Sequence, residues 1–195
     1  MVERIARFLE ETQASYTRAG GLIGFDRDVA EGSLMLLAGG QVIALPVSIV
    51  AERRRSREVE LRIYHATRSL GVEATPRAAP DLHGTAELSL PRIVQANLAA
   101  AARHDASAIL ATFQEQGRVR DAAGTQHQKD GGGLATFYAT RAGSEQLRAG
   151  LADDGRACAL EFTRAPSEGP ARSGLAIYER GESGLLREVR LYEEL

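Results

Sequence analysis

The sequence predicts an α+β fold that occurs twice in the chain, the second time in full. The first observation is a repeat: residues 61–64 read Leu-Arg-Ile-Tyr, and residues 189–192 read Val-Arg-Leu-Tyr, 128 positions later (190 − 62 = 128). Residues 48–50 match 176–178 at the same offset, and residues 5–9 match 134–138 at 129. The second observation is that helical spacing of apolar residues gives way to strand-like runs in both halves. Self-similarity at a fixed period indicates two copies of one fold.

The first copy is expected in residues 1–72, as one helix followed by a meander of strands. Ile5, Phe8, Leu9 and Tyr16 have helical spacing over residues 3–18, and a Gly-Gly pair follows as a stop. Four apolar runs, at 34–37, 42–45, 47–50 and 59–64, predict antiparallel strands. Counting back by the repeat offset places the start of this copy about 40 residues before Met1, so we expect it to be partial.

Residues 73–87 are expected to be a linker, and residues 88–195 a complete second copy. Ser89 and Asp105 are plausible N-caps of two successive helices, the second with an apolar stripe that runs to Phe113. A strand is predicted at 117–121, and a third helix begins near residue 134 after a run of three glycines. Three more strands are predicted at 156–164, 172–180 and 185–193. This order predicts a helix layer on one face of a curved antiparallel sheet.

Composition excludes several classes of function. The formal net charge is −2, which provides no field for nucleic acid or an anionic membrane. The arginines at 53–55 fit a solvated hairpin turn better than a phosphate site. The single cysteine, Cys158, excludes an intramolecular disulfide framework and fits a small buried apolar residue. No signal peptide or membrane span is apparent, so we expect a cytoplasmic protein. The four histidines show no metal-ligand spacing, and we expect neither a metal nor a cofactor.

Residues 104–113, 117–124 and 134–138 resemble the nuclear-transport-factor-2-like superfamily, and within it the SnoaL-like and ketosteroid-isomerase-like proteins. The matching features are a helix that begins at Asp105, a strand that ends in Asp121 and a helix that contains Phe137 and Tyr138. His104 stands where members commonly have glycine, and Ala122 where they have proline. The resemblance covers 88–195 in full and 3–70 in part. It implies a cone, with the helix layer on the concave face of the sheet, present as one complete and one partial copy.

Asp121 is the candidate catalytic residue. Its side chain is expected to share a face with Val119 inside the cone, where desolvation would raise the pKa of the carboxyl and make it usable as a base. The resemblance implies the same role, because the matching aspartate of ketosteroid isomerases is the general base. The alternative is that Asp121 only accepts hydrogen bonds from the loop at 122–124.

Asn97 and Glu161 are further pocket candidates with open alternatives. Asn97 falls where steroid isomerases have a tyrosine, and Ala176 where they have a second acid, which counts against that reaction. Asn97 could bind a substrate carbonyl or Asp121, or make a structural hydrogen bond. Glu161 alternates with Leu160 and Phe162, so it faces either the pocket or solvent and a second sheet. The expected pocket residues are Asn97, Phe113, Val119, Phe137, Tyr138 and Glu161.

Two classes of function remain open. The first is a cofactor-independent cyclase, isomerase or epoxide-hydrolase-type enzyme that uses Asp121 as the base on a small hydrophobic substrate. The second is a noncatalytic binding or dimerisation module. A solvent-reachable cavity with Asp121 in its wall would favour the enzyme. Because the resembling proteins often dimerise sheet against sheet, we also expect a homodimer or an internal pseudo-dimer.

Overall fold

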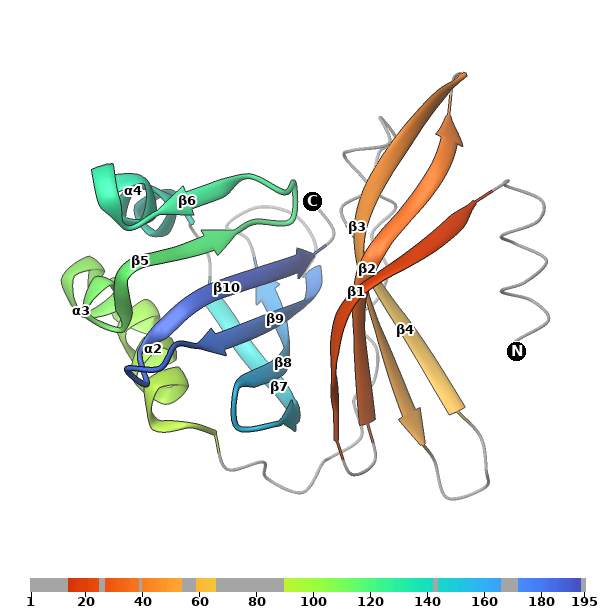
Figure 1. The fold of residues 1–195 in the computed structure, drawn as a ribbon. Helices are drawn as coiled ribbons and strands as arrows, with labels where there is room; N and C mark the ends of the chain where they lie inside the picture. The colour runs from red at the N-terminus through yellow and green to blue at the C-terminus, as the bar shows by residue number, and fades with distance from the viewer. Residues whose placement is uncertain are drawn as a thin grey trace.

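The computed structural model describes residues 14–24, 27–38, 40–53, 59–65, 90–141, 144–165 and 172–193. Two β-sheets lie face to face, and the helices cover the face of the larger sheet that points away from the smaller one (Figure 1). The four-stranded sheet has the order β1-β2-β3-β4, and the six-stranded sheet has the order β6-β5-β10-β9-β8-β7. The predicted α+β architecture, with a complete and a partial unit, is confirmed.

The four-stranded sheet is antiparallel throughout and comprises β1 (Ser15–Ile23), β2 (Arg27–Ala38), β3 (Gln41–Arg53) and β4 (Val59–His65). The helix predicted over 3–18 is wrong from Ser15 onward, and the residues before 14 lie outside the described part. Tyr16 pairs with Leu34 across the sheet, and a Cβ at Gly21 would lie 2.5 Å from the Val29 carbonyl oxygen. The glycines therefore permit close strand pairing here, and that pairing overrides the local helical spacing.

The runs at 42–45 and 47–50 are one long strand, β3, and not two. Pro46 lies between them and is paired with Ser33 in the register of β2 and β3. Sequence reasoning separated the two runs at the proline, but the extended backbone continues through it. The predicted linker and Ser89 lie outside the described residues, and the domain boundaries stay a prediction.

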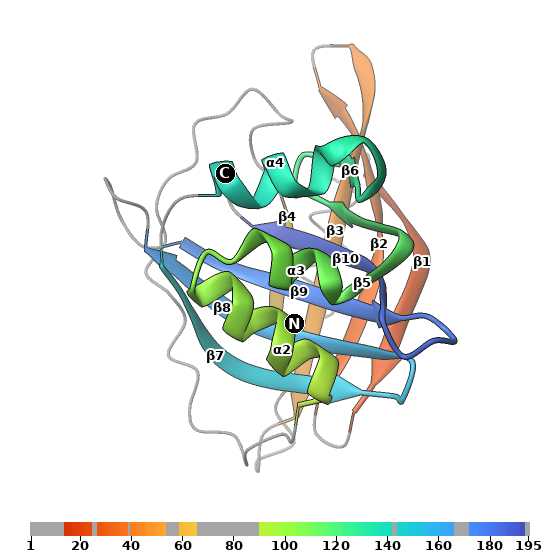
Figure 2. The same ribbon diagram turned by 90° about the vertical axis from the view of Figure 1, so that its left-hand side faces the viewer.

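In its described residues, the C-terminal unit consists of three α-helices and six strands, with one 3₁₀ turn. Its elements are α2 (Arg92–Ala102), α3 (Ala106–Ala111), β5 (Phe113–Arg120), β6 (Gln126–Gln128), η2 (Asp130–Gly132), α4 (Gly133–Thr140), β7 (Ser144–Asp153), β8 (Ala157–Ala165), β9 (Arg172–Arg180) and β10 (Leu186–Glu193). Asp105 caps α3 as predicted, because its carboxylate accepts a hydrogen bond of 3.0 Å from the Ala108 amide. Pro91, without a side-chain bond, is the N-cap of α2. Figure 2 shows the helices lying across the curved sheet.

Three features of the six-stranded sheet differ from the prediction. Phe113 begins β5 and does not extend the stripe of the second helix. Strand β5 pairs with β10 in parallel, so the sheet is mixed. Strand β7 and the short β6 were not predicted; β7 reads Ser-Glu-Gln-Leu-Arg-Ala-Gly-Leu-Ala-Asp, in which alanine and glycine weaken the alternation that marks a strand.

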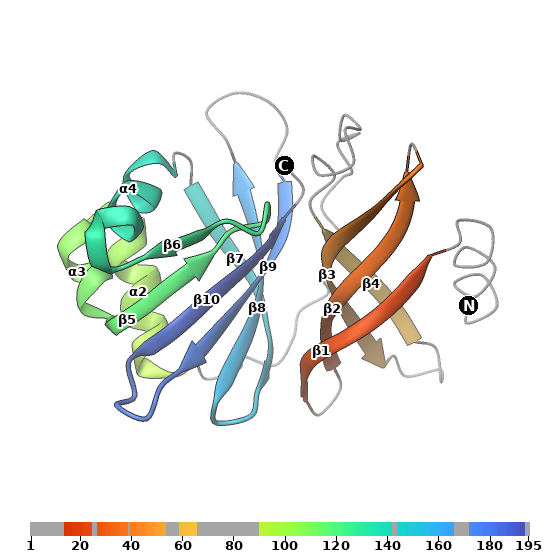
Figure 3. The same ribbon diagram turned by 45° about the horizontal axis from the view of Figure 1, so that its top comes forward.

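Two apolar cores hold the layers together. One lies between the helices and the six-stranded sheet and includes Phe113, Val119, Leu134 and Leu160. The other lies between the two sheets and includes residues from both units. Figure 3 shows the sheets as separate layers, with α2, α3 and α4 on the side of the six-stranded sheet that faces away from the four-stranded sheet. Successive residues along β8, and likewise along β9, therefore face different cores.

Candidate functional site

A cavity of about 710 Å³ lies between the helices and the six-stranded sheet. Leu160 and Phe162 of β8 and Ala176 and Tyr178 of β9 form its floor. Its other lining residues come from α2, α3, α4 and the residues that follow them: Leu98, Ala101, Ala102, His104, Ala106, Ile109, Tyr138, Ala139 and Arg141. The strand residues face this side because side chains alternate along β8 and β9.

The polar groups of the cavity are an arginine, a histidine and two tyrosines, and no Asp or Glu is among its described lining residues. The Arg141 guanidinium carbon lies 5.5 Å from the centre of the Phe137 ring and 5.8 Å from that of Phe162. Both are cation–π distances, which keep the guanidinium beside the apolar wall. His104 has a positive φ of 54° at the tight turn between α2 and α3, the position where the resembling proteins commonly have glycine.

Asp121 directly follows β5 and does not line this cavity. Its carboxylate accepts a hydrogen bond of 2.9 Å from the Thr125 amide and lies 2.9 Å from His127 Nε2. The His127 ring packs on Phe137, with ring centres 4.6 Å apart. Asp121 therefore closes the turn between β5 and β6. This arrangement matches the alternative in which Asp121 binds its own loop, but its contacts are with Thr125 and His127 and not with residues 122–124.

Of the expected pocket residues, only Tyr138 lines the cavity. Asn97 is buried, and its side-chain amide donates to the Thr112 hydroxyl at 2.9 Å, so the structural hydrogen bond is the arrangement present. Phe113 and Val119 are fully buried in the core, and Phe137 packs against that core beside His127. Sequence periodicity identified these side chains as inward-facing but did not separate core from cavity wall.

Glu161 faces the four-stranded sheet and not the cavity, so the pocket interpretation of this residue is wrong. Arg62 donates to it through Nε at 2.7 Å and Nη2 at 3.1 Å, and the Tyr64 hydroxyl donates at 2.5 Å. Its side chain is 1% exposed. Leu160 and Phe162, on either side of it in β8, point into the opposite core. Glu161 therefore belongs to the contact between the sheets.

A second cluster of the same composition lies across the same contact. Arg190 donates to Glu31 through Nε at 2.7 Å and Nη2 at 2.9 Å, and the Tyr192 hydroxyl donates to Glu31 at 2.8 Å. We call the two clusters the Glu161 clamp (Arg62, Tyr64, Glu161) and the Glu31 clamp (Arg190, Tyr192, Glu31). The repeated Arg-x-Tyr pattern marked four of these residues in the sequence. No local sequence pattern marked Glu31 as a member of this contact.

Both clamp tyrosines are expected to resist ionisation in alkali. Burial first, and then the negative charge of the bound glutamate, raise the pKa of Tyr64 and of Tyr192. A pKa raised in the folded state gives stability that is present below the unfolded value of about 10 and is lost as pH rises toward the folded value. In a near-ultraviolet titration of tyrosinate at about pH 11, these two hydroxyls should ionise only with unfolding. Tyr64→Phe with Tyr192→Phe should remove two late-ionising groups, and early ionisation of all five tyrosines in the folded wild type would contradict the prediction.

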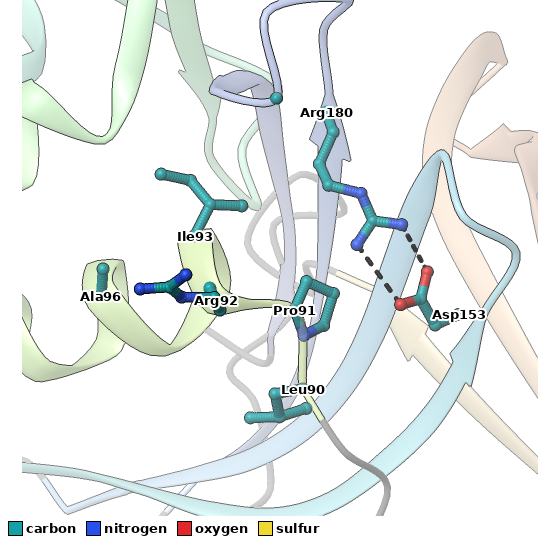
Figure 4. Close-up of a pocket in the computed structure, with 8 residues that line it drawn as sticks. Leu90, Pro91, Arg92, Ile93, Ala96, Asp153 and Arg180 are labelled. Carbon is teal, nitrogen blue, oxygen red and sulfur yellow. Dashed lines mark hydrogen bonds and ion pairs between the residues drawn. The ribbon is translucent and has the colours of Figure 1, made fainter.

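A wider depression, of about 920 Å³, lies at the start of α2 (Figure 4). Leu90, Pro91 and Ile93 line one side, and the Arg180 guanidinium points at the Asp153 carboxylate on the other. Although partial burial opposes it, the hydrogen bond from Arg180 lowers the pKa of Asp153. Arg180 and Asp153 are paired with each other. More apolar and aromatic side chains line the cavity below the helices, so that cavity is the better candidate site.

Within the described residues, no group of three or more His, Cys, Asp or Glu side chains is placed to hold a metal ion. None of the described helices is long and apolar enough to cross a membrane. Burial raises the pKa of the Cys158 thiol to about 12, so this cysteine is a poor nucleophile.

No protein-family model matches the sequence, and no curated protein matches it. Solved structures align with about half of the chain. A nuclear-transport-factor-2-like protein of unknown function from Cytophaga hutchinsonii is 9% identical, with 56% of this chain and 94% of that chain covered and a TM-score of 0.47. A similar protein from Burkholderia xenovorans is 15% identical, with 52% and 80% covered and a TM-score of 0.45. An epoxide hydrolase/cyclase-like enzyme with a role in pyran ring formation in the polyether salinomycin is 13% identical, with 52% and 87% covered and a TM-score of 0.45. At these identities no activity is transferred to this chain.

Proposed function

We propose that the C-terminal unit binds a small, mainly apolar molecule in the cavity between its helices and its sheet. The observation that supports this function is the cavity itself, whose volume of about 710 Å³ is within the range of ligand sites. Its wall consists largely of aliphatic and aromatic side chains, and its few polar groups come from different elements. Apolar area favours binding, and the polar groups would orient the ligand.

The ligand is proposed to have an anionic or strongly hydrogen-bond-accepting group near Arg141. Arg141 is the permanently charged side chain among the described lining residues. Its guanidinium lies against Phe137 and Phe162, where a cation attracts an anion more strongly than in open water. The hydroxyls of Tyr138 and Tyr178 add groups that can both donate and accept.

The placement of Asp121 favours binding over base catalysis. A general base must come within hydrogen-bond reach of the proton that it removes. Asp121 lies outside the cavity wall, and its carboxylate is already bonded to Thr125 and placed beside His127. Catalysis through Asp121 would require a substrate that extends to the β5–β6 turn. The noncatalytic alternative is therefore the stronger proposal for this cavity.

Binding is tested with 8-anilinonaphthalene-1-sulfonate, an apolar probe with one anionic group. The chain has no tryptophan, so the probe signal is free of that background. We expect saturable fluorescence with one bound probe per chain. Ala102→Phe, at the cavity rim, should weaken binding, whereas Ala99→Phe, exposed on the same helix but outside the lining, should not. Equal affinity in both variants, or no saturable binding by the wild type, would contradict the proposal.

The role of Arg141 is tested with a charged and a neutral probe. Because a hydrogen bond to a charged group contributes about 1.5–3 kcal/mol, Arg141→Gln should weaken sulfonate binding about tenfold or more. The neutral analogue N-phenyl-1-naphthylamine should bind the wild type and Arg141→Gln with similar affinity. A parallel loss for both probes would mean that the arginine shapes the cavity and does not recognise charge.

A further inference from the structure

The turn between α2 and α3 has a histidine at a backbone position that glycine usually occupies. The His104 amide donates to the Ala101 carbonyl at 3.0 Å, and the Asp105 amide donates to the Ala100 carbonyl at 3.0 Å. These two bonds form a Schellman motif, in which the first residue past the helix has a left-handed backbone. That residue is His104, with a φ of 54°.

Histidine in this conformation costs free energy that glycine does not. A Cβ crowds the backbone in the left-handed region, and glycine has none. Each of the other positions with a positive φ in the described residues is a glycine. Residues held in rarely populated backbone conformations cluster at ligand-binding and active sites. The backbone of His104 therefore favours a functional role for its side chain.

Other groups perform the structural tasks of this turn. The two bonds that end α2 are backbone bonds, and the Asp105 carboxylate caps α3 by accepting from the Ala108 amide at 3.0 Å. The Ser107 hydroxyl donates to the same carboxylate at 2.8 Å. None of these contacts involves the imidazole of His104. That side chain is exposed and lines the cavity, so it lies where the cavity meets solvent.

His104 and Arg141 bring two groups that can carry positive charge to one cavity. The α2–α3 turn and the end of α4 lie toward the same side of the helix layer (Figure 2), and both contribute lining residues. No Asp or Glu is among the described lining residues that could neutralise the two groups. An anionic group of a ligand would therefore be attracted to both walls.

Few other ionisable groups surround the imidazole. Arg103 and Asp105 flank His104 in the chain, and the Asp105 carboxylate is bonded within the α3 cap. From α4 and β9, the ionisable lining groups are Arg141 and the hydroxyls of Tyr138 and Tyr178. Arginine keeps its charge at any pH at which the protein is folded, so it does not make binding depend on pH.

We infer that His104 is a ligand-binding residue of the cavity, and that its protonated imidazole contacts an anionic group of the bound molecule. This role rests on the proposed function and adds a pH dependence to it. Histidine changes its charge between about pH 5 and 8. A mainly apolar organic acid that stays ionised over this range should therefore bind more tightly as the pH falls.

The test compares the wild type with His104→Gly in both binding and stability. The sulfonate of 8-anilinonaphthalene-1-sulfonate stays ionised throughout, so only the protein titrates. The wild type should bind this probe about three- to fivefold more tightly at about pH 5.5 than at about pH 8, as expected for a charge contact open to solvent. His104→Gly should lose this dependence and bind as weakly as the wild type does at the higher pH. Because glycine relieves the left-handed backbone, this variant should also have a higher thermal midpoint.

Two further variants and a neutral probe are the controls. His104→Asn tolerates the left-handed backbone but cannot be charged, so it should lose the pH dependence as glycine does. Arg103→Gln removes an exposed charge from the same turn, outside the lining, and should leave the affinity and its pH dependence unchanged. The uncharged N-phenyl-1-naphthylamine should bind the wild type and His104→Gly with similar affinity at both pH values.

The outcomes separate the role of His104 from the proposed function. If both probes bind saturably, a sulfonate affinity that is independent of pH, or a pH dependence that His104→Gly retains, would overturn the role of His104 and leave the cavity as a binding site. A lower thermal midpoint of His104→Gly would assign the histidine to the turn and would also overturn that role. No saturable binding of either probe by the wild type would contradict the proposed function itself.

Discussion

Replacing Glu161 with alanine is expected to lower the free energy of unfolding by about 3 kcal/mol. Removal of one member of a buried ion pair costs about 3–5 kcal/mol, because the remaining charge stays buried without compensation. Arg62 and Tyr64 would both lose their hydrogen-bond acceptor in the core between the sheets. The loss should fall at the lower end of that range, because Arg62 retains Glu52 and Glu60.

Urea unfolding followed by circular dichroism measures this loss. Glu31→Ala removes the equivalent acceptor from Arg190 and Tyr192 and should destabilise by a similar amount. Glu115→Ala, at an exposed position of β5, is the control and should change the stability by less than about 0.5 kcal/mol. A Glu161→Ala loss no larger than that of the control would show that the clamp does not stabilise the chain.

Replacing Gly174 with alanine is expected to destabilise the chain by about 1–3 kcal/mol and to weaken probe binding in the cavity. A Cβ at Gly174 would lie 2.4 Å from Cζ of Phe162, which is paired with it across β8 and β9. The Phe162 ring forms part of the cavity floor and would have to move. The Phe162 ring therefore occupies the space that a side chain at position 174 would need.

A double-mutant cycle distinguishes this clash from a general effect on the strand. Phe162→Leu shortens the side chain that meets the new methyl group, so Gly174→Ala should cost less in that background than in the wild type. The coupling energy should lie between about 0.5 and 3 kcal/mol, as for residues in contact. Additive losses would indicate that Gly174 is required for a reason other than its contact with Phe162.

The repeated Arg-x-Tyr strands show how far sequence reasoning could proceed. Their spacing identified two equivalent strands, β4 and β10, before any contact was known. It could not identify their acceptors, because Glu31 and Glu161 lie on other strands and on the opposite sheet. The alternation of side chains along the strand showed that Glu161 faces away from Leu160 and Phe162. It did not show which face of the sheet the helices cover.

Two strands, β1 and β7, were missed by the sequence prediction for a related reason. Tyr16 had helical spacing, yet its strand pairs with β2 through glycines that let the backbones approach. Strand β7 has weak β-propensity and is formed by its pairing with β8. In both cases the pairing energy comes from a neighbouring strand, which a local window does not contain.

By itself the sequence determined the α+β class, the cap of α3 at Asp105, the third helix and the equivalence of the two Arg-x-Tyr strands. These features depend on local spacing, capping and self-similarity, which a single chain displays. Only the tertiary structure decided that Glu161 faces the other sheet, that Asp121 binds the β5–β6 turn and that the cavity lies beside Arg141. Those outcomes depend on which face of each element is covered by a segment distant in sequence, and burial is settled only when the layers pack.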